Sequence, residues 1–327
     1  MDVRFVGPAG IEEYDARALP QLLDRADGFT WVDVPVLDGD AERLLTDGLG
    51  CHPAVLEACR RRNHVPSVHA YETHFFTILH APLLGGTGHV HLLELDQVVG
   101  RNHLVTVHGP INPAVDPEAS LLETRALLRR IDEGRFRPAT AAEASYALGS
   151  AIARRQRELI GQVAEKLPDL EVQVMAPSFR QPEELLERMF LVRHELTTAR
   201  TMAAQSHDVY ARITTLEDHV PEVDRRFARD LADQFDRVRS VGDGESQFLH
   251  GVIELYQTRV HTKMTVAMER LAVIAAVTLP ITALASIYGM NLIVHGETQP
   301  WHLVVVVAVM AAIGALLLRW ARRQGWW

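Results

Sequence analysis

Cysteine is scarce in this sequence, and the short motifs of several enzyme classes are absent from it. The two cysteines, Cys51 and Cys59, have a spacing that matches no zinc or redox motif, which favours reduced thiols over a disulfide framework. The sequence has no phosphate-binding loop, no Gly-x-Ser-x-Gly and no His-Glu-x-x-His. No apolar run follows Met1, so we expect no cleavable signal peptide. We therefore predict a protein that is not an enzyme and carries no catalytic cofactor.

Basic residues are also fewer than acidic ones. The chain has 33 Lys and Arg against 42 Asp and Glu, a formal net charge of −9 over 327 residues. A nucleic-acid partner favours a basic surface, so we expect none here. An acidic surface suits a protein that gathers cations, but it is equally common among ordinary soluble proteins, and charge alone leaves that choice open.

Charged side chains are missing altogether from two stretches near the C-terminus, residues 271–288 and 303–318. Each approaches the ~17–25 apolar residues that cross a bilayer as a helix. Trp301 precedes the second stretch and Trp320 follows it, as suits the headgroup interface. We therefore predict transmembrane helices over about 271–290 and 302–320. The alternative, a hydrophobic hairpin buried in a soluble domain, is disfavoured because soluble helices of this length normally have a polar face.

Five basic residues flank these stretches on the side away from their connection: Lys263, Arg270, Arg319, Arg322 and Arg323. The connection itself, residues 291–302, contains no lysine or arginine. Because loops rich in lysine and arginine stay in the cytoplasm, both termini are predicted to be cytoplasmic and the connection external. The sequence thus indicates a multi-pass protein of the inner or plasma membrane, with about 270 cytosolic residues before the first span.

The cytosolic part is predicted to contain two regions. Residues 1–168 alternate short β-branched or aromatic runs with helical patterns, which favours a layered α/β domain. The predicted strands are residues 30–34, 75–79, 92–99 and 104–108, and the predicted helices are 53–61, 117–131 and 139–167. Residues 169–270 are predicted to be helical and to lead into the transmembrane domain, residues 271–327.

A stalk helix is predicted to begin near Pro221, because no proline except Pro280 follows before Gly289. Unbroken, at ~1.5 Å per residue, this helix would be roughly 100 Å long, and a rod of that length suggests association with identical stalks. Gly242 and Gly244 each cost ~1 kcal/mol relative to alanine within a helix. The sequence leaves open whether the helix continues through them.

Hydroxyl side chains repeat at four-residue spacing in the first predicted span, at Thr278, Thr282 and Ser286, and so share one helical face. Apolar residues continue this face toward the cytosol: Ala275, Leu271 and Met268. The face suits the lining of a pore, which two helices per chain can enclose only in an oligomer. Small and hydroxylated residues also mediate helix packing in membranes, and the stripe alone does not decide between the two.

The end of the first span carries a family resemblance. Leu279-Pro280-Ile281-Thr282, followed by Ile287-Tyr288-Gly289-Met290-Asn291, a short loop and a second span with a basic tail, resembles the CorA family of magnesium and divalent metal ion transporters. The resemblance implies a homopentamer in the lipid bilayer, with a funnel-shaped cytosolic region and the first span lining the pore. It implies Mg²⁺ as the transported and regulatory ion, with cobalt and nickel as further substrates. It also implies a selectivity filter of Gly289, Met290 and Asn291 at the outer mouth.

The helical face and the resemblance together give eight pore-lining residues: Thr265, Met268, Leu271, Ala275, Thr278, Leu279, Thr282 and Ser286. The chemistry of Asn291 fits the filter. Mg²⁺ gives up its water reluctantly, and a ring of neutral carbonyl oxygens can hydrogen-bond the water shell without stripping it. Gly289 permits close approach of the chains. Asparagine also tolerates the left-handed geometry of a helix C-terminus, and the two roles can coexist.

Two places depart from the family pattern. Thr265 stands where the family commonly has an asparagine, which makes a shorter and less polar ring near the cytosolic end of the pore. The external loop reads Val294-His295-Gly296-Glu297 in place of a Met-Pro-Glu-like stretch. Glu297 at the outer mouth either attracts cations or is simply solvated.

In the family, acidic residues at cytosolic subunit interfaces bind Mg²⁺ and hold the pore closed. Alignment without gaps back from Asn291 places Glu254 at the regulatory acid of the stalk. Glu94 and Asp96 are the candidate metal-binding partners from a neighbouring chain. An exposed and merely solvated carboxylate is an equal alternative for Glu254.

Histidines are numerous, 16 in all, and His89 and His91 would share one face of a strand. Imidazole suits Zn²⁺, Co²⁺ or Ni²⁺ better than Mg²⁺, but no third ligand stands at metal-site spacing. Two alternatives to a magnesium transporter therefore stay open. One is a zinc transporter of the same superfamily, and the other is a membrane-anchored cytosolic binding protein with no pore.

Overall fold

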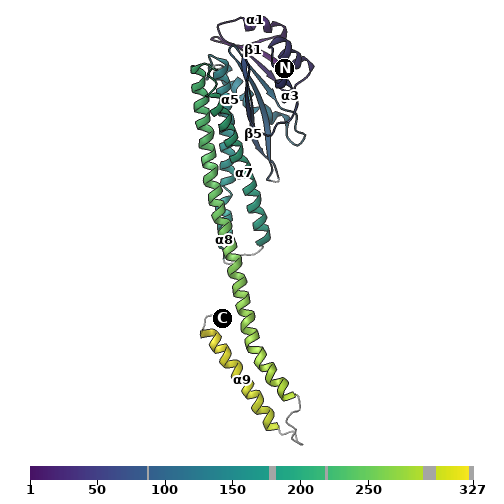
Figure 1. The fold of residues 1–327 in the computed structure, drawn as a ribbon, viewed down its shortest axis with the longest axis vertical. Coiled ribbons are helices and arrows are strands. Elements are labelled where there is room, and N and C mark those ends of the chain that lie inside the picture. Colours follow the sequence, from purple (N-terminus) through teal and green to yellow (C-terminus); the bar gives the residue numbers. More distant parts are fainter. Residues whose placement is uncertain (87, 177–181, 218–219, 290–299, 324–327) are drawn as a thin grey trace. The chain divides into compact units, whose positions relative to one another are not determined.

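The computed structural model describes residues 1–86, 88–176, 182–217, 220–289 and 300–323. The chain divides into two compact units, residues 1–251 and 252–327. The first contains a sheet with the helices that cover it, and the second contains two long helical segments (Figure 1). The predicted domain boundaries near residues 168 and 270 rest on composition and stay a prediction.

A seven-stranded sheet lies at the centre of the first unit, in the order β2-β1-β3-β7-β6-β5-β4. Its strands are β1 (Asp2–Gly7), β2 (Gly10–Tyr14), β3 (Phe29–Val34), β4 (Ser67–Ala70), β5 (His74–Leu84), β6 (Val90–Gly100) and β7 (His103–His108). Neighbouring strands are antiparallel except β3 and β7, which run parallel and pair Trp31 with Leu104. The four predicted strands are present as β3, β5, β6 and β7.

Helices cover both faces of this sheet, because successive residues of each strand point to opposite sides. On one face, Val32 and Val107 belong to a core shared with α1 (Leu19–Leu23), α2 (Gly39–Arg43) and α3 (Pro53–Arg60). On the other face, Trp31 and Leu104 belong to a core shared with α4 (Leu122–Asp132), α5 (Ala141–Ala164), α7 (Pro182–Ile213) and the first part of α8. A short helix, α6 (Leu167–Met175), precedes α7. The predicted layered α/β architecture is confirmed.

The start of α5 shows how local sequence sets a helix boundary. Thr140 Oγ1 accepts a hydrogen bond from Glu143 N at 3.1 Å, and the Glu143 carboxylate accepts one from Ala139 N at 2.8 Å. These reciprocal bonds satisfy backbone donors that a helix N-terminus would otherwise leave unpaired.

The long stalk helix is continuous. α8 (Glu222–Gly289) has 68 residues and does not break at Gly242 or Gly244. A Cβ atom at Gly242 would lie 3.3 Å from Arg200 Cβ and 3.3 Å from Ile160 Cδ1, so α8 approaches α5 and α7 closely there. Arg200 Nε also pairs with Asp243 Oδ1 at 2.8 Å. These contacts help to offset the ~1 kcal/mol that Gly242 costs within a helix.

The second unit contains the remainder of α8 and α9 (Pro300–Arg323). Both helices are long and apolar enough to span a bilayer, and almost none of either apolar stretch is buried by the rest of the protein. A hairpin in the core of a soluble domain would be covered by other segments, so this exposure speaks against that alternative. The two helices meet at Gly314 of α9, where a Cβ atom would lie 3.6 Å from Ile281 Cδ1.

Candidate functional site

The predicted pore-lining residues form one exposed stripe on α8. All eight side chains are exposed: Thr265, Met268, Leu271, Ala275, Thr278, Leu279, Thr282 and Ser286. At 3.6 residues per turn, the seven from Met268 to Ser286 fall within an arc of about 100°, and Thr265 lies just beyond it. The helix therefore brings these residues together along its length, as the spacing predicts.

The covered side of this helix is the opposite one. Val273 is buried, and Val277, Ile281 and Leu284 are partly buried. Gly314 of α9 lies against Val277 and Ile281. Because α9 packs on this side, helix packing within one chain does not account for the hydroxyl stripe. The stripe is left to face a bilayer, another protein chain or a water-filled path.

The threonine hydroxyls of the stripe donate hydrogen bonds to backbone oxygens of their own helix. Thr278 Oγ1 donates to the Ile274 backbone oxygen at 2.9 Å, and Thr282 Oγ1 donates to the Thr278 backbone oxygen at 2.8 Å. Thr265 Oγ1 makes the same bond to the His261 backbone oxygen at 3.0 Å. A hydroxyl whose proton is committed presents only its lone pairs outward. The threonines of the stripe therefore offer hydrogen-bond acceptors, which suit the outward-pointing hydrogens of a hydrated cation.

α8 ends at Gly289, which is exposed and has no atom within 4 Å of a Cβ added to it. Room for close approach of another chain is thus present at Gly289. The other two residues of the predicted filter, Met290 and Asn291, and Glu297 of the predicted outer mouth lie outside the described residues.

Glu254, the predicted regulatory acid, lies on α8 within the second unit and is exposed. Its backbone oxygen accepts a hydrogen bond from Thr258 Oγ1 at 2.9 Å. Among the described residues, no hydrogen bond or ion pair engages its carboxylate. Glu254 is therefore an accessible anionic group, as a metal ligand or a solvated surface residue would be.

Glu94 and Asp96, in contrast, are buried in the first unit. Glu94 is 6% exposed and Asp96 is fully covered. The Glu94 carboxylate accepts hydrogen bonds from Asn63 N at 2.7 Å and from Asn63 Nδ2 at 2.6 Å. Burial raises the pKa of both carboxyl groups, and the neighbouring Glu94 charge raises the pKa of Asp96 further. A carboxylate that binds a metal between subunits must be exposed on its own chain, and these two are not.

Asp96 lies beside the Cys59 thiol of α3. Within the described chain, neither oxygen of Asp96 has a partner at good hydrogen-bond geometry. Burial raises the pKa of the Cys59 thiol, and it raises the pKa of Cys51 to about 11. Both cysteines are free thiols, as predicted, and both are inert because a buried thiol resists forming the reactive thiolate. We read Glu94 and Asp96 as polar groups of the core.

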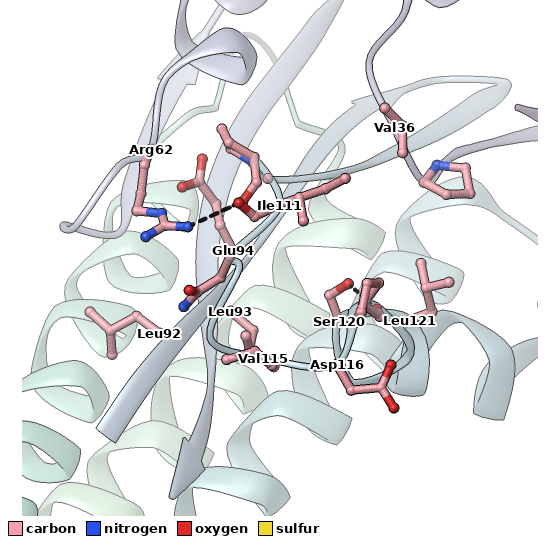
Figure 2. Close-up of a pocket in the computed structure, with 15 residues that line it drawn as sticks. Val36, Arg62, Leu92, Leu93, Glu94, Ile111, Val115, Asp116, Ser120 and Leu121 are labelled. Atoms are coloured by element: carbon pink, nitrogen blue, oxygen red, sulfur yellow. Dashed lines mark hydrogen bonds between the residues drawn. The ribbon is translucent and has the colours of Figure 1, made fainter. Parts of the chain in front are cut away.

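A small pocket of about 100 Å³ opens where the parallel strands β3 and β7 end (Figure 2). Glu94 and Arg62 line it, and Arg62 Nη2 donates to the Pro110 backbone oxygen at 3.4 Å. The carboxyl edge of parallel strands is a common ligand site in α/β sheets. We assign no ligand to this pocket.

A buried polar chain, not indicated by the sequence patterns, joins the same two strands. Trp31 Nε1 donates to Thr106 Oγ1 at 3.0 Å, and Thr106 Oγ1 donates to Asp33. His108 Nε2 lies 3.0 Å from Asp33 Oδ1, and His108 Nδ1 lies 2.9 Å from the Ser120 backbone oxygen. The chain of bonds fixes the β3–β7 pair to the segment that leads into α4. All four side chains are buried, which suits a structural role.

Comparison with known proteins gives the functional context. The model of the CorA-like Mg²⁺ transporter protein family matches residues 26–323. The cobalt/magnesium transport protein CorA of Thermotoga maritima is 23% identical over 91% of this chain and 83% of its own length. The full-length CorA structure from Methanocaldococcus jannaschii covers 100% of this chain and 99% of its own, with a TM-score of 0.80 and 18% identity. The cytoplasmic domain of ZntB from Vibrio parahaemolyticus covers 80% of this chain and 98% of its own, with a TM-score of 0.61 and 9% identity. The predicted fold class is confirmed by the match to the full-length CorA structure.

Proposed function

Because the chain belongs to the family of CorA-like Mg²⁺ transporter proteins, we propose that it carries hydrated Mg²⁺ down its electrochemical gradient through a pore made by several copies of α8. The chain is a divalent metal transporter of the membrane and not an enzyme. The magnesium preference, the pore and its gating are the proposal.

The observation that carries the proposal is the exposed stripe on the side of α8 away from α9. A polar stripe that faced lipid would cost free energy, because hydrocarbon cannot hydrogen-bond the threonine oxygens. Several copies of α8 with their stripes turned inward would remove that cost and enclose a path of acceptor oxygens and apolar rings. We propose five copies, the number that the resemblance to the family implies. Native mass spectrometry that showed only monomers or dimers would overturn this arrangement.

The filter belongs at the outer mouth, where Asn291 follows Gly289 in the sequence. A ring of neutral amide oxygens would hydrogen-bond the first water shell of Mg²⁺ without replacing it. A ring of carboxylates would hold the ion more tightly and slow its release. We propose that Glu297 adds no more than a local attraction for cations before they reach this ring.

Orientation follows from the basic residues at the end of the second span. Arg322 and Arg323 lie in the last turn of α9, and Arg319 lies one turn earlier. Because basic residues stay on the cytoplasmic side, both termini are proposed to be cytoplasmic in an inner or plasma membrane. Divalent cations would then enter from the side of the connection between the spans.

Closure is proposed to depend on Glu254, whose accessible carboxylate can bind Mg²⁺ when the cytosolic concentration is high. A ring of such ligands would be occupied at high concentration and empty, hence mutually repulsive, at low concentration. Because Glu94 and Asp96 are buried in the first unit, we assign them to the core, and the partner acid of Glu254 is to be sought among other residues.

Substituted cysteines test the pore directly, because Cys51 and Cys59 are both buried and unreactive and need not be removed. Thr282→Cys in the stripe and Val277→Cys on the α9 side are a matched pair. In liposomes loaded with a Mg²⁺ indicator, a water-soluble cationic thiol reagent should block flux through Thr282→Cys and leave Val277→Cys unaffected. Equal sensitivity of the two variants would mean that the stripe does not line the path.

The same liposomes distinguish the alternatives when Mg²⁺, Co²⁺, Ni²⁺ and Zn²⁺ are compared. Zinc flux above magnesium flux would favour a zinc transporter, the reading that the histidine content supports. The likeness to the ZntB domain concerns the fold alone at 9% identity. Absence of flux for every cation would favour a membrane-anchored binding protein.

A further inference from the structure

We infer that His89 and His91 form a binding site for one borderline transition-metal ion, such as Zn²⁺ or Ni²⁺, in the first unit. His91 is the second residue of β6, and His89 immediately precedes that strand. Their ring centroids are 4.8 Å apart, with an angle of 79° between the ring planes. Two imidazoles at this separation can bind a single ion through one nitrogen each.

The hairpin places both rings before any ion arrives. Val90, between them, is buried, whereas the rings of His89 and His91 contact each other on the other side of the backbone. Gly85 N donates to the His89 backbone oxygen at 2.7 Å, and Leu83 pairs with His91 across the ladder. A Cβ atom at Gly85 would lie 2.9 Å from His91 Nε2, so the ring occupies space that only glycine leaves open.

The ring nitrogens are available as ligands. Among the described residues, no hydrogen bond or ion pair engages the nitrogens of either histidine, whereas the buried His80 and His108 are bonded to backbone oxygens. His89 is exposed and His91 is partly exposed, so an ion reaches them from solvent. No hydrogen bond within the protein has to be broken when such an imidazole binds a metal ion.

Ligand type sets the choice of ion. Neutral nitrogen donors favour Zn²⁺, Ni²⁺ and Cu²⁺, whereas Mg²⁺ requires six oxygens in a near-octahedral arrangement. Within the described parts of the chain, no group of three or more His, Cys, Asp or Glu side chains could hold a metal ion. Waters therefore complete the coordination, and binding is reversible and weaker than at a closed structural zinc site. The site lies in the first unit, whereas the proposed pore stripe lies in the second.

The test uses the full-length protein in detergent with millimolar Mg²⁺ present, which fills oxygen sites but does not compete for imidazole. Zn²⁺ is titrated against a chromophoric chelator. His89→Asn and His91→Asn should each weaken binding at one site per chain by about tenfold or more, or ~1.4 kcal/mol. His69→Asn is the matched control, because His69 is an exposed histidine on β4 and makes no ring contact with another described histidine.

Cu²⁺ gives a spectroscopic readout that a merely structural effect would not move. Its electron paramagnetic resonance spectrum should show coupling to two nitrogens in the wild type and in His69→Asn, and to fewer in either site variant. An unchanged melting temperature of the metal-free variants would show that the fold is intact. Equal Zn²⁺ affinity in the wild type and both site variants, or identical Cu²⁺ spectra, would overturn the proposal.

Discussion

Loss of the hydroxyl acceptors on α8 should reduce Mg²⁺ flux without disturbing the helix. Thr278→Val combined with Thr282→Val keeps the side-chain shape and removes one acceptor at each of two levels. The internal bonds of these hydroxyls, to backbone oxygens at 2.9 and 2.8 Å, are also lost, but those oxygens remain bonded within the helix. A hydrogen bond to a charged species is worth ~1.5–3 kcal/mol, and a hydrated ion regains only part of it from neighbouring waters. Flux should therefore fall by about 10- to 100-fold, since 1.4 kcal/mol is tenfold.

The assay is Mg²⁺ uptake into liposomes by purified protein, with protein incorporation measured in the same vesicles. Thr262→Val is the matched control. Thr262 is an exposed threonine on the same helix, and its hydroxyl donates to the Thr258 backbone oxygen at 2.8 Å. At 100° per residue, however, it lies about 160° around the helix from both Thr278 and Thr282. The control removes the same atoms and the same internal bond and should conduct like the wild type.

Wild-type flux in the double variant, or an equal loss in Thr262→Val, would refute this reasoning. The first outcome would mean that hydrated ions do not touch the threonine oxygens. The second would mean that the internal hydroxyl bonds matter for the helix itself, and that the position of the stripe is irrelevant.

Three further changes test other parts of the molecule. Asn291→Ala should nearly abolish Mg²⁺ flux with an unchanged oligomer size, and Asn291→Asp should bind cations more tightly yet conduct poorly; wild-type flux in the alanine variant would place the filter elsewhere. Glu254→Ala should leave flux less sensitive to cytosolic Mg²⁺ in a titration of the inner solution, and unaltered sensitivity would exclude Glu254 as the regulatory acid. His108→Ala should lower the unfolding free energy by ~1–3 kcal/mol, because Asp33 stays buried and keeps only its hydrogen bond from Thr106. A melting curve in detergent checks this last point against the exposed His69→Ala, which should melt like the wild type.

The two apolar helices could be predicted because a helix that crosses a bilayer needs a long run of residues without charge. Such runs are directly visible in the sequence. The four predicted strands could be recognised for a similar reason, because buried strands contain runs of β-branched and aromatic residues. The strand β2 lacks this signal because it lies at the sheet edge, and its Glu12 and Glu13 are exposed. Edge strands need no apolar face, so composition does not reveal them.

The burial of Glu94 and Asp96 could have been predicted from the sequence. Both alternate with Val98 along β6 and must point to the same side as that core residue. The parallel pairing of β3 with β7 could not have been predicted in this way, because a long crossover separates Trp31 from Leu104 in the sequence. The continuity of α8 at Gly242 depends likewise on Arg200 and Ile160, which come from helices far away in the sequence. Sequence patterns indicate local structural preferences, whereas the pairing of distant strands and the continuity of a helix through glycine depend on tertiary contacts.

The stripe on α8 has a consequence for proton competition. None of its eight residues has an ionisable side chain. A pore lined by carboxylates or imidazoles loses its attraction for cations as those groups take up protons, whereas alcohol oxygens and apolar side chains do not titrate in the physiological range. Acidification would therefore leave the lining chemically unchanged, and protons would find no chain of acids and bases along it to follow. Any acid sensitivity of transport would have to arise outside the stripe, at groups such as Glu254 or the cytosolic histidines.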